Sequence, residues 1–160
     1  MLEQQNERLV EKVSFCEIYN NSNLSDIKSF SPNYEFKVID CKGNVSEQTV
    51  SVTVTLKHSL PHQSVKLFIG SQKPIAYGET GNSFEYKEAE FPQSSGIMGY
   101  QSFNMPTDIL IKGTLVFRNV LSQTQKFTMV KGKLRYQNED GGGNKGEGEF
   151  EIKNLNINWN

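Results

Sequence analysis

The chain has 160 residues, enough for one well-buried core and too few for two domains of ordinary size. Its 17 lysine and arginine residues are matched by 18 acidic residues, so no excess of positive charge is available to neutralise a phosphate backbone. Nucleic acid is therefore not expected as a partner. The 10 phenylalanine and 6 tyrosine residues can bury large apolar areas, which argues against disorder throughout.

Compartment is only weakly constrained by the sequence. No run of about 18 apolar residues is present, and the first residues lack the apolar region of an export signal. Either the protein is cytoplasmic, or its export signal precedes the sequence given. The two cysteines, Cys16 and Cys41, fall far below the density of a disulfide scaffold, but they can pair if the protein matures outside the cytoplasm.

The first 33 residues differ in pattern from the rest. Residues 2–13 are rich in helix formers and predict a short helix. This helix is either the end of a longer coiled stalk, which would allow self-association, or an arm that packs on the body. Residues 20–33 are dense in turn-forming residues and predict a polar connector. We therefore expect a tether over residues 1–33 and one folded domain over 34–160.

From residue 34 onward the apolar residues recur with a period of two, as in strands with one buried face. The clearest example is the run Val50, Val52, Val54 and Leu56. Asp40–Asn44 before it has the composition of a hairpin turn. Further strands are expected at 34–38, 65–69, 74–77, 84–91, 109–117, 127–136 and 150–159. The predicted core comprises Phe36, Val38, Val50, Val52, Val54, Leu56, Leu67, Ile69, Ile111, Leu115, Phe117, Ile157 and Trp159.

Three irregular regions interrupt this alternation. Pro92–Pro106 is rich in glycine, serine and proline, and residues 138–148 are glycine-rich and predict a flexible hairpin tip. In the last segment the apolar phase changes between Ile152 and Leu155, which predicts a bulge or bend near residues 153–154. Together these features predict an all-β fold, an antiparallel two-sheet sandwich with a short N-terminal helix.

The strand-like stretches 36–38, 49–56, 74–84 and 108–120 follow one another in an order that resembles immunoglobulin-like domains of bacterial exported and cell-envelope proteins. The resemblance covers about 125 residues and consists of structural patterns rather than a motif. It implies an immunoglobulin-like β-sandwich in the extracytoplasmic bacterial cell envelope. No catalytic residue is carried over with it.

Residues suited to catalysis are scarce. His58 and His62 are the only histidines, and Pro61 between them disfavours the helix on which their spacing could bind a metal. We expect them in a loop as two solvated imidazoles. No nucleophile elbow and no zinc-protease motif occurs. The pattern predicts no enzyme, no cofactor and no metal site, and the pair Glu88 and Glu90 is the alternative in favour of an enzyme.

Four acidic residues flank the glycine-rich tip: Glu139, Asp140, Glu147 and Glu149. Hard cations such as calcium prefer several oxygen ligands on a flexible loop, so these carboxylates could gather around one. A solvated hairpin tip, in which acidic residues keep the edge soluble, explains them more simply.

Binding is the remaining class of function. The aromatic residues Tyr77, Phe84, Tyr86, Phe91 and Tyr100 could form a stacking platform for sugar rings or a peptide, or they could belong to the core. We predict a non-catalytic accessory or protein-interaction domain of a bacterial cell-envelope protein, with a protein partner in the envelope. The alternative is a carbohydrate-binding module whose partner is a glycan.

Overall fold

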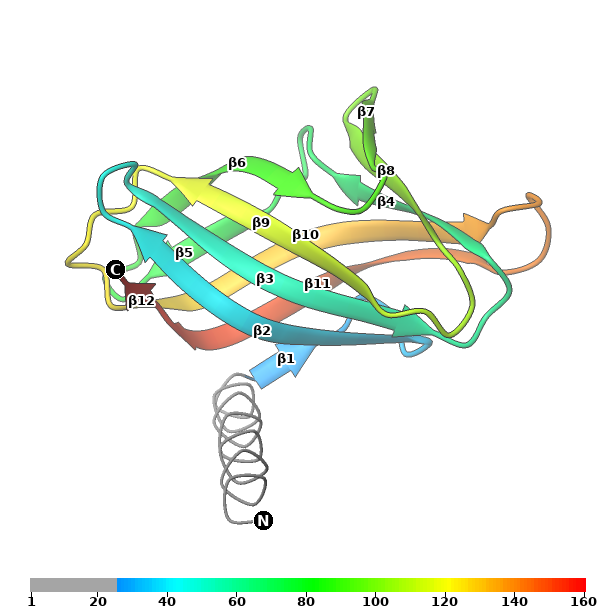
Figure 1. Ribbon diagram of the computed structural model, residues 1–160, viewed down its shortest axis with the longest axis horizontal. Helices are drawn as coiled ribbons and strands as arrows, with labels where there is room; N and C mark the ends of the chain where they lie inside the picture. Colours follow the sequence, from blue (N-terminus) through cyan, green and yellow to red (C-terminus); the bar gives the residue numbers. More distant parts are fainter. Residues whose placement is uncertain (1–25) are drawn as a thin grey trace, which may run out of the picture.

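The computed structural model describes residues 26–160, and the predicted N-terminal helix and Cys16 lie outside these described residues. The described part is all-β and contains no helix, so none long and apolar enough to span a membrane is found in it (Figure 1). Its strands are β1 (Asp26–Lys28), β2 (Tyr34–Asn44), β3 (Thr49–His58), β4 (Gln63–Phe68), β5 (Ile75–Gly78), β6 (Ser83–Glu90), β7 (Ser95–Ile97), β8 (Tyr100–Met105), β9 (Ile111–Arg118), β10 (Lys126–Asn138), β11 (Lys145–Asn156) and β12 (Asn158–Trp159).

The strands form one continuous hydrogen-bonded sheet, which corrects the expectation of two separate sheets. The order along the sheet is β12-β2-β3-β9-β6-β5-β10-β4-β8-β7, and β11 lies on the other side of β10 with β1 beyond it. Pairing is antiparallel except between β12 and β2, which run parallel. Continuity arises because β6 pairs with both β9 and β5, and so joins what would otherwise be two sheets.

The sheet folds over on itself so that β2, β3 and β9 lie opposite β10 and β11 (Figure 1). Aromatic rings bridge the two layers: Phe36 of β2 stacks on Phe150 of β11 with centroids 4.8 Å apart, and Phe117 of β9 meets Phe127 of β10 edge-on at 5.7 Å. Such pairs add to the stabilisation that comes from the buried apolar area. The packing is therefore that of a sandwich, although the hydrogen bonding is that of one sheet.

The predicted core is confirmed for all but two of its members. Val50, Val52 and Leu56 are completely buried. Ile69 and Trp159 are only partly buried, because Ile69 lies just beyond the end of β4 and Trp159 lies at the edge of the sheet, where its indole Nε1 donates to the carbonyl of Thr124. Strand alternation thus predicted correctly which residues are buried in the middle of strands, and was less accurate at the ends of strands.

The hairpin turn predicted at Asp40–Asn44 is wrong. These residues continue β2 and pair with β3, with Asn44 opposite Thr49, and the turn is formed by residues 45–48. Gln48 there has a left-handed φ of 54°. The acidic and glycine residues of 40–44 suit a turn by composition, but pairing with a strongly β-forming neighbour strand outweighs that preference.

The connector and the irregular region also contain strands. Residues 26–28 form β1 and pair with β11, and Phe30 is buried, so the folded domain includes residues 26–33, which the pattern had assigned to the connector. Pro92–Pro106 contains β7 and β8. By contrast, the bend expected near residues 153–154 is confirmed. Asn154 has a φ of 56°, and the buried residues change from Phe150 and Ile152 before it to Leu155 after it, which breaks the two-residue alternation.

Candidate functional site

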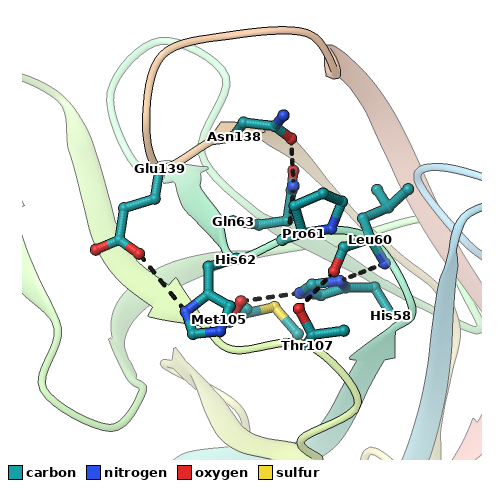
Figure 2. Close-up of polar contacts among 9 residues, drawn as sticks. All are labelled: His58, Leu60, Pro61, His62, Gln63, Met105, Thr107, Asn138 and Glu139. Atoms are coloured by element: carbon teal, nitrogen blue, oxygen red, sulfur yellow. Dashed lines mark hydrogen bonds and ion pairs between the residues drawn. The ribbon is translucent and has the colours of Figure 1, made fainter.

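One end of the molecule holds a buried polar network around the loop between β3 and β4 (Figure 2). His58 ends β3 and is buried, which corrects the prediction of a solvated imidazole. Its Nε2 lies 2.9 Å from the carbonyl oxygen of Met105, and its Nδ1 accepts from the backbone N–H of Leu60 at 3.1 Å. A neutral ring with its hydrogen on Nε2 satisfies both contacts. Because both ring nitrogens are occupied, His58 has a structural role.

Gln63 is the centre of the same network and is completely buried. Its Nε2 donates to the carbonyl of Pro61 and to Oδ1 of Asn138, each at 2.7 Å, and its Oε1 accepts from the hydroxyl of Tyr34 at 3.3 Å. Burial, followed by the nearby Tyr136, raises the pKa of Tyr34, so its hydroxyl stays protonated and donates. The network fixes the β3–β4 loop against the start of the β10–β11 hairpin.

The exposed groups at this end are more scattered. His62 Nδ1 lies 3.8 Å from Glu139 Oε2, and both side chains are more than half exposed. Asp140 accepts from the backbone N–H of Gly142, while Glu147 pairs with Lys133 and Arg135 of β10. Within residues 26–160, no three acidic, histidine or cysteine side chains come together as a metal site needs. The four acidic residues near the tip do not form one cluster.

A second candidate lies on the outward face of the sheet at β4, β8 and β10. Phe68 of β4 and Tyr100 of β8 meet edge-on with centroids 4.9 Å apart. Three cations lie over these rings: Lys133 is 5.0 Å from the Phe68 centroid, Lys66 is 5.8 Å from the Tyr100 centroid, and Arg135 lies within 5.6 Å of both. We call these five residues the aromatic–basic face.

Glu147 of β11 borders the aromatic–basic face. Its Oε1 lies 3.0 Å from Lys133 Nζ, and its Oε2 lies 3.1 Å from an Nη of Arg135. The hydrogen bond from Lys133, followed by that from Arg135, holds the pKa of this carboxyl below its usual range. One carboxylate is therefore shared between two cations, and Lys66 has no ion-pair partner among the residues that the structure describes.

The β7–β8 hairpin extends this face with exposed apolar residues and projects from the body (Figure 1). Ile97 lies opposite Tyr100 in the pairing and is 58% exposed, and Met98 at the tip is 94% exposed. Met98 and Gly99 both have left-handed φ angles, of 47° and 86°. Two successive left-handed residues are typical of a tight hairpin turn, but an apolar residue other than glycine is uncommon at such a position.

The five aromatic residues proposed as a platform are not brought together on one surface. Phe84 and Phe91 are buried, and Phe91 stacks on Phe103 at 4.2 Å. Tyr86 is partly buried against the core, and Tyr77 lies half-buried on β5. Tyr100 alone of the five belongs to the aromatic–basic face. The other members were missed because they come from β4 and β10, far away in the sequence. The available signal was spacing: Lys66 and Phe68 are two apart and share the outward face of one strand, and Lys133 and Arg135 do the same on another.

Comparison with known proteins gives no family. No family model and no curated protein matches the chain. Solved structures similar in shape include the fimbrial subunit MyfA of Yersinia enterocolitica, with 8% identity, a TM-score of 0.44, and 83% of this chain and 97% of that one covered. The GAE domain of yeast GGA1 has 11% identity, a TM-score of 0.43 and coverages of 82% and 97%. PapD-like domain 7 of human CEP192 has 12% identity, a TM-score of 0.42 and coverages of 87% and 85%. Similarities this distant assign no function.

Proposed function

We propose that this domain is a non-catalytic protein-interaction module, and that a partner protein docks on the aromatic–basic face together with Ile97 and Met98. The observation that carries the proposal is the exposed apolar tip beside partly buried aromatic rings. Interfaces concentrate their binding energy in such apolar and aromatic anchors, surrounded by a polar rim. Here Lys66 and Arg135 supply the rim.

The backbone of Met98 supports this proposal. A left-handed conformation costs a residue with a side chain roughly 1 kcal/mol or more, and such strain tends to persist where it serves a function. Every other non-glycine residue with a positive φ in residues 26–160 is Asn, Asp or Gln. Asn and Asp tolerate this conformation best. Placing a flexible methionine there instead presents a large apolar side chain to solvent.

A carbohydrate-binding module is less well supported. A sugar ring stacks on a bare, flat aromatic face, whereas both rings of the aromatic–basic face have cations lying over them. The buried Phe84 and Phe91 offer no exposed face either. Retardation of the protein by soluble polysaccharides in affinity electrophoresis would favour the glycan and contradict our proposal.

We also propose that the module acts in the extracytoplasmic bacterial cell envelope. This proposal rests on the resemblance of the strand-like stretches to immunoglobulin-like envelope domains. The test is the genomic sequence upstream of Met1, where an export signal or a lipoprotein signal is expected. A start codon at Met1 with no upstream signal, together with recovery of the native protein from the cytoplasmic fraction, would contradict it.

The docking surface is tested with peptides selected from a displayed random library against the full 160-residue chain. Peptides bound at the apolar tip should bind about tenfold more weakly to Ile97→Ser and Met98→Ser variants, as expected when an interface anchor is lost. Val45→Ser is the matched control, because Val45 is 48% exposed in the turn between β2 and β3. Failure to enrich any peptide, or equal binding by all three variants, would contradict the docking surface.

A further inference from the structure

Lys66 and Arg135 lie directly opposite one another in the pairing of β4 with β10. Both side chains point outward and both lie over the ring of Tyr100. Side chains directly opposite across a pair of strands have Cβ atoms only about 5 Å apart, and like charges placed there are destabilising. The arrangement therefore costs stability within the folded domain.

This pair is an exception within the described sheet. In every other directly opposite pair in which both residues are charged, the charges have opposite signs: Asp26–Lys153, Lys28–Glu151, Glu35–Lys57, Glu85–Arg118, Lys131–Glu151, Lys133–Glu149 and Arg135–Glu147. The sequence thus follows the charge rule across the sheet and breaks it at one position. Departures from a rule that is otherwise obeyed are expected at functional sites.

The neighbouring carboxylates do not relieve the repulsion at Lys66. Glu147 is shared between Lys133 and Arg135. Glu149 and Glu151 lie on β11, on the far side of β10 from Lys66. On the other side of Lys66, the opposite residue is the neutral Ser102 of β8. An anion seated between Lys66 and Arg135 would be attracted by both cations, and the aromatic rings beneath would partly shield it from water.

We propose that the partner protein presents a carboxylate of an acidic segment to Lys66 and Arg135, while its apolar side chains cover Ile97 and Met98. This inference rests on the proposed function and adds the chemistry of the partner. Charge complementarity decides the occupant: the unbalanced charges are positive, and the adjacent hairpin is apolar. A segment that alternates acidic and apolar residues fits both features.

The first experiment measures the coupling between the two cations in the unbound protein. Lys66→Gln, Arg135→Gln and the double variant form a double-mutant cycle, and unfolding midpoints are recorded at low and high salt. We expect a repulsive coupling. Each single substitution relieves the repulsion, so the second substitution should lower the midpoint more in the background of the first than it does alone, by about one to three degrees in a chain of this size. The difference should shrink at high salt. An attractive or absent coupling at low salt would overturn the inference.

The second experiment measures binding of a peptide that alternates glutamate and leucine. Its affinity should fall about fivefold in Lys66→Gln and decrease with added salt, as expected for one ion pair at an interface rim. The matched control is Lys112→Gln, because Lys112 is an exposed strand lysine opposite the neutral Thr55 and its loss changes the net charge equally. A second peptide has glutamine in place of glutamate. Its affinity for the wild-type protein should be no higher than the affinity of the glutamate peptide for Lys66→Gln.

The outcomes separate this inference from the proposed function. If the glutamate and glutamine peptides bind equally well and both depend on Met98, the docking surface stands and the acidic partner is wrong. If neither the two peptides nor library peptides bind, both proposals are wrong. If polygalacturonate binds in a manner that depends on Lys66 and the peptides do not, the occupant is an acidic glycan, which contradicts a protein partner.

Discussion

Replacing Gln63 with leucine tests the polar network that fixes the end of the sandwich. Leucine has nearly the same volume as glutamine but cannot hydrogen-bond, so the change leaves the Pro61 carbonyl, Oδ1 of Asn138 and the hydroxyl of Tyr34 without this partner. Gln63 is completely buried, and water cannot replace it without opening the structure. We therefore expect a large loss of stability from a substitution that changes neither charge nor size.

The magnitude follows from the three bonds. Each hydrogen bond contributes a net 0.5–1.5 kcal/mol, roughly, and more where a buried group is left unpaired, so the summed loss is about 3–5 kcal/mol. The apolar side chain returns part of this by its own burial, about 1 kcal/mol. A net loss of about 3 kcal/mol lowers the melting temperature of a domain of this size by roughly 6–12 °C.

The assay is thermal and urea unfolding of the full chain, followed by circular dichroism. Gln125→Leu is the control, because Gln125 is exposed and its one bond to the Ser122 carbonyl is long at 3.5 Å; it should change the midpoint by less than about 2 °C. Tyr34→Phe should cost less in the Gln63→Leu background than in wild type, since the hydroxyl has already lost its acceptor. A midpoint for Gln63→Leu within about 2 °C of wild type would refute the network as a source of stability.

Three further predictions address the core and its charges. A side chain at Gly113 would overlap the ring of Phe91, so Gly113→Val should cost more than about 2 kcal/mol in urea unfolding, and a neutral result would contradict this packing. Burial, followed by the nearby Asp40, raises the pKa of the Cys41 thiol, so in a Cys16→Ser chain Ellman's reagent should label Cys41 only as the protein unfolds, and rapid labelling in native buffer would contradict its burial. Because the pKa of Glu147 is lowered, its contribution to stability is present above the usual pKa of glutamate, about 4.3, and is lost as the pH falls below it. Glu147→Gln should therefore weaken the acid-induced fall of the midpoint, and an unchanged pH profile would contradict the ion pairs.

The fold was predictable from the sequence where the information is local. Alternation along Val50–Leu56 and Ile111–Phe117 placed the correct side chains in the core, because a strand with one wet face must alternate. The strands β7 and β8 were missed, since their short segments gain stability from pairing, β8 with β4 and β7 with β8, rather than from their own composition. Local patterns also could not predict that β6 pairs with both β5 and β9 and so joins the two layers into one sheet, because this depends on which strands pair.

The candidate site was less predictable for the same reason. Tyr100 was identified, but its companions Lys66, Phe68 and Arg135 each lie more than 30 positions from it in the sequence and meet it only through strand pairing. His58 was expected in solvent because nothing in its neighbourhood indicates that the β3–β4 loop folds back over it. Contacts between distant segments thus decided both the position and the role of these residues.

The aromatic–basic face and the adjoining β7–β8 hairpin each depart once from the physical regularities that the rest of the domain follows. The described residues leave no buried side-chain polar atom without a partner, and their other directly opposite charges have opposite signs. On this face Lys66 opposes Arg135, and on the adjoining β7–β8 hairpin Met98 carries backbone strain. Tyr100 connects the two features, because it pairs with Ile97 on one side and with Phe68 on the other. Each feature alone would be a small defect that a stable sandwich tolerates. Their proximity is what a binding surface requires, since a partner that covers the apolar tip buries the exposed Met98 side chain and a partner carboxylate relieves the repulsion between the two cations.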